Sequence, residues 1–250
     1  MGKIISIIIA TYNAEKVLKR CLDSIVTQKT GDVEVLIVDG NSTDSTMEIV
    51  QSYGTDVDYS LSEKDKGIYD AWNKALKVAK GDWIMFLGSD DYILPGSIKI
   101  YLDYVKHVDR NETDIICAKC NFINKDGKVI AVLGKPYKYE DFKKYMNVIH
   151  GTTLHNLNLF KELGPFSLKY KICADYEFLL RRPLRAEFID SPLVCVQTGG
   201  VSYSVGMLID TFKIKRQVKC SPLVADVFYF TKGVVSLQIK KLIQRLILTS

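Results

Sequence analysis

The chain has 250 residues, 47% of them hydrophobic and 25% charged, which is the composition of a globular protein with a sizeable core. The sequence contains no low-complexity segment and no internal repeat, so disordered and repeat-protein classes are excluded. The formal net charge is +5, but residues 211–250 alone carry +7, so the preceding 210 residues sum to −2. The basic charge belongs to the C-terminal segment, which contains no recognisable nucleic-acid-binding module.

The cysteines and the N-terminal residues argue for a reduced, cytoplasmic protein. Cys117 and Cys120 are the only closely spaced pair, and side chains three positions apart in a strand point to opposite faces, so no zinc site is expected. The apolar run at residues 4–10 is short and continues into a polar turn, so we expect a first strand there and not a secretory signal.

The first hundred residues alternate between strand and helix patterns. Apolar, β-branched runs predict four strands, at residues 3–13, 33–40, 57–63 and 82–88. Helical spacing of apolar side chains predicts the connecting helices, at residues 13–28, 42–53 and 67–79. This alternation is typical of βαβ units and therefore predicts an α/β fold with a mainly parallel sheet.

Local signals refine these elements. Asn13 is the predicted N-cap of the first helix, and Asp44 or Ser42 that of the second. The third helix is predicted to bury an apolar stripe made of Ile68, Trp72, Ala75, Leu76 and Ala79.

The pattern loosens after residue 95. A helix is predicted at residues 95–108 with Pro95 in its first turn, followed by a hairpin whose turn is Asn124–Gly127. One further strand is expected at residues 186–197. We therefore expect a catalytic domain at 1–205, divided into a nucleotide-binding half (1–95) and an acceptor-binding half (96–205), and a helical tail at 206–250.

Polar residues follow each of the four predicted strands, where ligands bind in open parallel sheets. They are Thr11, Tyr12 and Asn13, then Asp39 to Asp44, then Glu63, Asp65 and Lys66, and finally Ser89, Asp90 and Asp91. Adjacent carboxylates repel each other unless a cation or ligand binds them, so the pair at 90–91 predicts a site for Mg²⁺ or Mn²⁺. No glycine-rich phosphate loop follows the first strand, so we expect a phosphate-bearing ligand to be held through the metal.

Four segments resemble the inverting family 2 glycosyltransferases and occur in the same order as in that family: "SIIIATYNAEKVLKRCLDSI", "EVLIVDGNSTDST", "EKDKGIYDAWNKALKVAKGDWIMFLGSDD" and "ADYEFLLR". The resemblance covers about residues 3–205 and is closest to members that assemble bacterial surface polysaccharides. It implies a GT-A fold and transfer of a sugar from a nucleotide diphosphate, with uridine favoured as the base. The implied acceptor is a saccharide or a lipid-linked sugar.

The resemblance also implies roles for individual residues. Asp39 would accept a hydrogen bond from the base. Five other residues at the strand ends would contact the substrate: Thr11, Tyr12, Asn13, Asp65 and Lys66. Asp90 and Asp91 would hold the metal, with Asp91 also near the ribose. Asp175 would be the catalytic base, although it could also cap a helix, and Glu177 is the next candidate.

Two positions leave alternatives open. Many relatives carry Asp where this chain has Gly88, so a ribose-binding carboxylate is absent or Asp90 replaces it. His150 is predicted either to contact phosphate or acceptor or to be structural, and His155 to be structural.

Two other functions fit parts of the sequence. A short-chain dehydrogenase fits the length, but the glycine motif after the first strand is missing. A catalytically inactive sugar-nucleotide-binding homologue is the other alternative, and the retained Asp90, Asp91 and Asp175 argue against it.

The tail carries an apolar face and a basic face. The apolar residues are Val235, Ile239, Leu242, Ile243 and Leu246, and the basic face includes Lys240, Lys241 and Arg245. Such a helix is predicted to lie on the inner surface of the cytoplasmic membrane, or alternatively to pack on the catalytic domain or on a second subunit.

Overall fold

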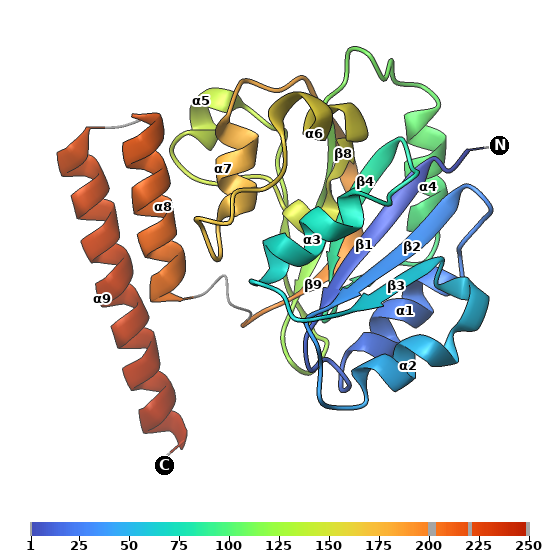
Figure 1. Ribbon diagram of the computed structural model, residues 1–250. Coiled ribbons are helices and arrows are strands. Elements are labelled where there is room, and N and C mark those ends of the chain that lie inside the picture. The colour runs from blue at the N-terminus through green and yellow to red at the C-terminus, as the bar shows by residue number, and fades with distance from the viewer. Residues whose placement is uncertain (1, 200–203, 220–221, 249–250) are drawn as a thin grey trace.

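A computed structural model describes residues 2–199, 204–219 and 222–248, with side chains up to residue 235. Within these residues one nine-stranded sheet forms the centre of the molecule, in the order β3-β2-β1-β4-β8-β6-β9-β5, with β7 paired to β6 (Figure 1). Helices cover both faces of the sheet. The expected α/β class is confirmed.

The first four strands are parallel neighbours: β1 (Ile5–Thr11), β2 (Val33–Asp39), β3 (Tyr59–Ser62) and β4 (Trp83–Gly88). β1 and β2 are almost completely buried, as expected for isoleucine- and valine-rich strands covered on both faces. Their register places Thr11 beside Asp39 and Asp39 beside Ser62, so the polar strand ends meet at one edge of the sheet.

Two apolar layers attach the helices to the sheet. One layer holds α1 (Leu18–Val26), α2 (Thr46–Ser52) and α4 (Ser97–Val105), and the short 3-10 helix η1 (Gly54–Asp56) follows α2. The opposite layer holds α3 (Ile68–Leu76), α6 (Leu157–Leu163) and α7 (Ala174–Leu180). The side chains of Ile7 and Ile8 on β1 point into different layers, which is the alternation expected of a strand.

Two helix starts differ from the sequence prediction. α1 begins at Leu18, and Asn13 is not its N-cap: Asn13 has a left-handed backbone with φ of 49°, and its side chain accepts a hydrogen bond from the Thr43 amide. α4 begins two residues after Pro95, which therefore lies outside the first turn of that helix.

In α3 the predicted stripe is buried at Trp72 and Ala75 and half-buried at Leu76 and Ala79, but its first residue is wrong. Ile68 is exposed, and Tyr69 is buried in its place beside Trp72. The sequence pattern missed this because tyrosine combines an apolar ring with a hydroxyl that needs a partner. The N-cap position of α2 is Ser45 and not Asp44 or Ser42, although Asp44 Oδ1 accepts a 3.0 Å hydrogen bond from the Thr46 amide at the start of this helix.

The second half completes the sheet with strands of both directions: β5 (Tyr92–Ile93), β6 (Ile115–Ile123), β7 (Val129–Leu133), β8 (Leu154–Asn156) and β9 (Ala186–Gln197). β6 and β7 form the predicted hairpin, β8 lies antiparallel between β4 and β6, and β9 is parallel to β6. Two short helices, α5 (Tyr139–Phe142) and η2 (His150–Thr152), lie between β7 and β8.

The C-terminal segment is a pair of helices, α8 (Val205–Val218) and α9 (Leu223–Leu248). Figure 1 shows α8 beside α7 and the C-terminal part of α9 extending past α8. Arg216 forms an ion pair with Asp226, and the Phe212 and Phe230 rings are 5.7 Å apart, so these contacts join the two helices. In the described part of the chain no helix is both long enough and apolar enough to cross a bilayer.

Candidate active site

Asp39 at the end of β2 is fully buried and accepts four hydrogen bonds. Their donors are the Thr11 hydroxyl (3.0 Å), the Ser42 amide (2.8 Å), the Ser42 hydroxyl (2.5 Å) and the Ser62 hydroxyl (2.7 Å). Burial alone would raise the pKa of Asp39, but these hydrogen bonds outweigh it and hold the pKa below its ordinary value.

These bonds change what Asp39 can contribute to substrate binding. A carboxylate offers about four acceptor positions. The hydrogen bond expected from a base would therefore have to displace one of the hydroxyls or the amide. In this arrangement Asp39 at the end of β2 is hydrogen-bonded to Thr11 at the end of β1 and to Ser62 at the end of β3.

A more accessible group of side chains lies directly beside it. An ideal Cβ at Gly40 would lie 3.0 Å from Asp65 Oδ2 and 3.3 Å from Tyr12 Cδ2, so these two side chains meet over the Gly40 backbone. The Tyr12 ring is exposed, and Asp65 Oδ1 accepts a 2.8 Å hydrogen bond from the Gly67 amide. The site thus has an aromatic face and a carboxylate next to each other, which suits a planar base with its sugar.

Asn13 and Lys66 border this group. The Asn13 amide donates to the Ser42 hydroxyl at 2.8 Å, so Asn13 joins the loop after β1 to the loop after β2. The backbone amide of Lys66 donates to Asp70 at 3.0 Å, and the Lys66 side chain is exposed. Both lie where the sequence placed them, at the edge of the strand ends.

The two carboxylates after β4 fold back over Gly88. An ideal Cβ at Gly88 would lie 2.7 Å from Asp91 Oδ2 and 3.0 Å from Asp90 Oδ1. The absence of a side chain at 88 therefore leaves the space that these carboxylates occupy. A side chain at position 88 would have to displace one of these carboxylates.

Contacts that the sequence did not reveal hold this loop to β9. Asp91 Oδ1 accepts a 2.9 Å hydrogen bond from the Gln197 amide. The Arg20 guanidinium donates to the Asp90 carbonyl at 2.8 Å and to the Gln197 side chain at 2.9 Å, and it lies over the Tyr92 ring. These residues come from separate parts of the chain, so only the fold brings them together.

The pair at 90–91 has the chemistry of a divalent-cation site. Burial, and then the charge of Asp90, raise the pKa of Asp91 to about 7, so a cation bound beside the pair would favour the ionised form of both carboxylates. Within the described residues no group of three His, Cys, Asp or Glu side chains could hold a metal ion. The pair fits a metal that takes its remaining ligands from a substrate diphosphate.

Asp175 is the second residue of α7, and its environment suits a general base. Burial raises its pKa to about 6, against hydrogen bonds from Tyr69 and the Tyr176 amide that lower it. The Tyr69 hydroxyl and the Tyr176 amide both lie 2.9 Å from Oδ1. The N-cap of α7 is Cys173, so Asp175 does not occupy the capping position that was its alternative role.

An aromatic cluster connects Asp175 with the β4 loop. Tyr69 contacts Trp72 with ring centroids 5.3 Å apart, and Trp72 stacks on His150 at 5.1 Å. An ideal Cβ at the next residue, Gly151, would lie 3.6 Å from Asp91 Oδ2. Packed aromatic side chains and the Gly151 backbone therefore lie between Asp175 and the carboxylate pair.

The two histidines of this region are buried. His150 packs against Trp72 and Phe86, and burial lowers its pKa to about 3, so it is neutral at physiological pH. His155 is fully buried, and its Nδ1 lies 3.3 Å from the Ile84 carbonyl. Of the two roles considered for His150, the structural one fits these contacts better, and the adjacent η2 backbone borders Asp91.

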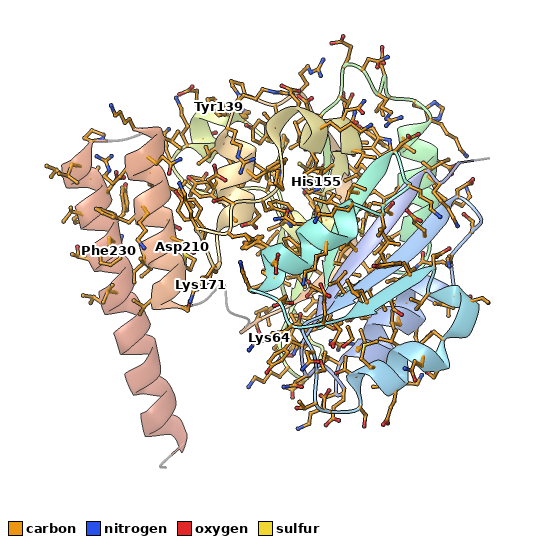
Figure 2. All side chains as sticks on the ribbon, viewed as in Figure 1. Lys64, Tyr139, His155, Lys171, Asp210 and Phe230 are labelled. Atoms are coloured by element: carbon orange, nitrogen blue, oxygen red, sulfur yellow. The ribbon has the colours of Figure 1, made fainter. Side chains whose placement is uncertain are left out.

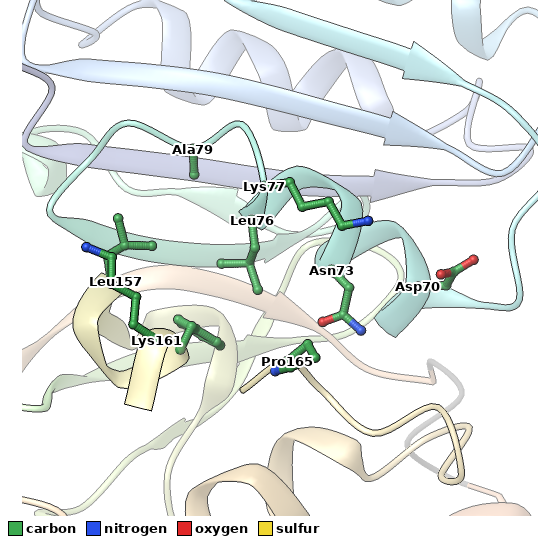
Figure 3. A pocket seen from close by; sticks show the side chains of 9 residues that line it. Asp70, Asn73, Leu76, Lys77, Ala79, Leu157, Lys161 and Pro165 are labelled. Atoms are coloured by element: carbon green, nitrogen blue, oxygen red, sulfur yellow. The ribbon is translucent and has the colours of Figure 1, made fainter. Parts of the chain in front are cut away.

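A separate cleft of about 650 Å³ lies between α3 and α6 (Figure 3). Its lining includes Asp70, Asn73, Lys77 and Lys161. None of its lining residues belongs to the polar residues that follow β1, β2, β3 and β4, so the candidate site and this cleft are distinct.

Comparisons with known proteins agree with the fold and identify the family. The family described as Glycosyl transferase family 2 matches residues 6–182. A PGL/p-HBAD biosynthesis glycosyltransferase of Mycobacterium bovis (strain BCG / Pasteur 1173P2) is 32% identical over 183 residues, which are 70% of this chain and 68% of that protein. Chondroitin synthase of Pasteurella multocida (strain Pm70) is 29% identical, over 71% of this chain but only 18% of its own length.

Solved structures share the fold at low sequence identity. S. aureus TarS superposes with a TM-score of 0.67 and 21% identity, over 89% of this chain and 41% of that one. The mannosyltransferase PcManGT from Pyrobaculum calidifontis, solved with GDP-Man and Mn²⁺, gives a TM-score of 0.66 and 16% identity, over 92% of this chain and 70% of that one. Because the family match spans most of the chain and includes the strand ends that carry the carboxylates, this protein belongs to glycosyl transferase family 2 and is a glycosyltransferase.

Proposed function

We propose that this glycosyltransferase moves a sugar from a UDP-sugar to a hydroxyl of a saccharide or lipid-linked acceptor, with inversion, in bacterial polysaccharide biosynthesis. The observation that carries the proposal is Asp175, a carboxylate with its pKa raised to about 6 that shares one aromatic cluster with the carboxylate pair after β4. A base with a pKa near neutrality is both ionised at working pH and able to take up a proton.

The nucleoside is assigned to the group formed by Tyr12, Gly40 and Asp65. The Tyr12 ring supplies a stacking surface, and Asp65 supplies a hydrogen-bond acceptor. Asp39 accepts a hydrogen bond from the Thr11 hydroxyl and so fixes Thr11 beside this group. Asn13 and Lys66 border the same group. Uridine is favoured as the base because TarS, at 21% and 19% identity in these complexes, was solved with UDP and with UDP-GlcNAc. PcManGT, which was solved with GDP-Man, is 16% identical to this chain.

Asp90 and Asp91 would hold Mn²⁺ or Mg²⁺ together with the donor diphosphate. When bound, such an ion neutralises the negative charge that develops on the departing diphosphate. The hydrogen bonds from the Gln197 amide and from Arg20 support this role, because they fix the loop that carries the two carboxylates.

The reaction is a single displacement. The acceptor hydroxyl oxygen forms a bond to the anomeric carbon while the bond between that carbon and the diphosphate oxygen breaks. The nucleoside diphosphate leaves with the electron pair of the broken bond, and the hydroxyl proton goes to Asp175. Attack from the face opposite the leaving group inverts the configuration.

The family match removes the main support for the dehydrogenase alternative. The remaining alternative, an inactive homologue, would bind the donor without turnover. We also propose that the protein acts in the cytoplasm at the inner membrane surface. Exposed apolar residues of α9 support this location, while a second copy of the chain is the competing occupant of that surface.

A donor screen followed by two substitutions tests this function. Melting temperatures are measured with UDP-glucose, UDP-GlcNAc and GDP-mannose, with and without Mn²⁺, because a ligand of the folded state raises stability by mass action. UDP release is then measured. Asp175→Asn should retain UDP affinity and lose about 10²- to 10⁴-fold in rate.

Asp90→Ala should lose Mn²⁺-dependent UDP binding without a change in melting temperature. Asp126→Ala, an exposed acidic residue in the β6–β7 turn, is the matched control and should behave as wild type. Normal turnover by Asp175→Asn would transfer the base role to another carboxylate such as Glu177. Donor binding without any turnover in the wild type would support the inactive homologue.

A further inference from the structure

The segment that leads into α7 is held from both sides by residues distant in sequence. On one side the Tyr69 hydroxyl of α3 donates to the Ile172 carbonyl at 2.5 Å. On the other side the Ile172 amide donates to Asp210 of α8 at 2.9 Å. The backbone of Ile172, three residues before Asp175, is thus hydrogen-bonded to α3 through its carbonyl and to α8 through its amide.

The next residue strengthens the same attachment. The Cys173 thiol donates to the Met207 carbonyl of α8 at 3.7 Å and lies 3.7 Å from the Thr211 hydroxyl. Cys173 is the N-cap of α7, and its side chain makes no capping hydrogen bond. The start of α7, and with it Asp175, is therefore positioned by α3 and α8 and not by a cap of its own.

Asp210 has no role in the proposed chemistry, yet it is only 7% exposed. Figure 2 shows it on the side of α8 that faces the body of the protein. Burying a carboxylate is costly unless hydrogen bonds compensate, so its bond to the Ile172 amide indicates a structural task for the charge. The family match ends at residue 182, before α8 begins.

We propose that Asp210 and Tyr69 are positioning residues that hold Asp175 in its catalytic orientation, which makes α8 a working part of the active site. This inference rests on the proposed role of Asp175 as the base. Asp210 acts on the Ile172 amide, and Tyr69 acts on both the Ile172 carbonyl and Asp175 Oδ1.

The Tyr69 hydroxyl suits both protonation states of the base. It has one proton and two acceptors, the Ile172 carbonyl and Asp175 Oδ1. When Asp175 is ionised, the two acceptors share this proton. After Asp175 has taken the acceptor's proton, the carboxylic acid O–H of Asp175 can donate a hydrogen bond to Tyr69 Oη. The Tyr69 O–H then donates its hydrogen bond to the Ile172 carbonyl alone.

The test compares Asp210→Ala, Asp210→Asn and Tyr69→Phe, using Mn²⁺-dependent UDP release from UDP-glucose and UDP-GlcNAc. Asp210→Ala should lower kcat by about 10- to 100-fold, with KM for the donor within about twofold of wild type, because a displaced base slows chemistry without weakening donor binding. Asp210→Asn keeps an oxygen acceptor for the Ile172 amide and should recover most of the rate.

Tyr69→Phe should move the acidic limb of the kcat–pH profile to higher pH. The hydroxyl stabilises the ionised carboxylate, so its loss raises the pKa of Asp175 further above its ordinary value. The other titratable groups around Asp175 are Cys173 from the preceding segment and Asp210 from α8, and both are unchanged in this variant. The same shift should appear without turnover, as a rise in the pH above which the loss of stability caused by ionisation of Asp175 levels off.

Asp226→Ala is the matched control, since Asp226 is a buried acid of the same helix pair that pairs with Arg216 and not with Ile172. It should keep the wild-type kcat. Wild-type kcat and pH profile in Asp210→Ala and Tyr69→Phe would overturn the inference, as would an equal loss in Asp226→Ala. If Asp175→Asn is inactive in the same experiment, the proposed base stands even when the positioning role fails.

Discussion

Asp175 is a residue whose catalytic environment has a cost in stability. Its pKa is about 6 in the folded chain and close to 3.8 when unfolded. Below about pH 4 the carboxyl is protonated in both states and contributes no difference. As pH rises from 4 to 6 the unfolded state ionises first, so the folded state loses up to about 3 kcal/mol, at about 1.36 kcal/mol per pKa unit.

Asp175→Asn should therefore stabilise the protein above pH 6 by up to about 3 kcal/mol and have no effect near pH 4. Urea unfolding of both proteins at pH 4, 6 and 8 measures this difference. An equal change in stability at all three values would mean that ionisation of Asp175 is not the cause.

Substitutions at Asp39 and Asp65 test whether the first carboxylate is structural and the second has the binding role proposed for it. Asp39→Asn places an amide group among four donors and should cost about 2 kcal/mol of stability. Asp65→Asn should leave the melting temperature unchanged and weaken UDP binding about 10-fold. Calorimetry with UDP and thermal melts decide between them. Weaker UDP binding in Asp39→Asn at unchanged stability would return the base contact to Asp39.

The sequence could place the carboxylates that follow strands, because parallel strands bring their carboxyl ends to one edge. It could not place Arg20, whose contact with Asp90 joins residues 70 positions apart. Nor could it show that Asp39 is saturated by hydroxyls, because that depends on the register of three strands. Tyr69 was missed for a similar reason, since a helical pattern does not reveal which hydroxyl finds a buried partner.

At the scale of elements, long buried strands and amphipathic helices were predictable, and short or exposed ones were not. β8 has three residues, too few to show any alternation, and its pairing with β4 and β6 is imposed by the tertiary structure. Asn13 looked like a cap because Asn favours both N-caps and left-handed turns, and here the turn prevails.

One buried carboxylate, Asp114, joins the residue before β6 to the segment that leads into β9. Asp114 accepts hydrogen bonds from Arg182 and Arg185, which follow α7 and lead into β9. Burial works against these bonds, yet the two arginines hold the pKa of Asp114 well below its ordinary value. The stability from this group is present above about pH 4 and is lost as pH falls toward the lowered pKa.

Asp114→Ala should lower the free energy of unfolding at pH 7 by about 3 kcal/mol, because it leaves two arginines without their shared partner. Glu162→Gln is the matched control, since Glu162 also binds Arg182 but is exposed, and it should destabilise the protein much less than Asp114→Ala. Urea unfolding measures both. Equal effects would show that Asp114 is one surface ion pair among several.

At the scale of the whole molecule, α8 and α9 differ in what they contact. α8 contacts the segment before α7, whereas α9 carries an exposed apolar stripe in which Val224 is 82%, Phe228 58% and Val235 54% exposed. At 100° per residue these three side chains lie within about 40° of each other around the helix. The sequence continues the stripe with Ile239, Leu242 and Leu246, whose side chains lie outside the described ones.

A membrane surface suits this stripe because the C-terminal segment is strongly basic, and each basic residue near an anionic surface contributes about 1 kcal/mol. Removing the whole segment after Ser204 would also remove Asp210, so substitutions on the exposed stripe make a cleaner test. Val224→Glu with Phe228→Glu changes only exposed positions. Ile130→Glu with Val132→Glu removes similar exposed apolar side chains from β7 and is the matched control.

The wild type and the β7 variant should sediment with phosphatidylglycerol liposomes at low salt and be released at high salt, because screening weakens the electrostatic part of the attraction. The α9 variant should remain in the supernatant under both conditions, with an unchanged melting temperature and unchanged UDP release from a soluble donor. If wild type and α9 variant sediment equally, or neither sediments, the stripe does not bind membranes. A molecular mass that doubles with concentration in the wild type, but not in the α9 variant, would then identify a second copy of the chain as its occupant.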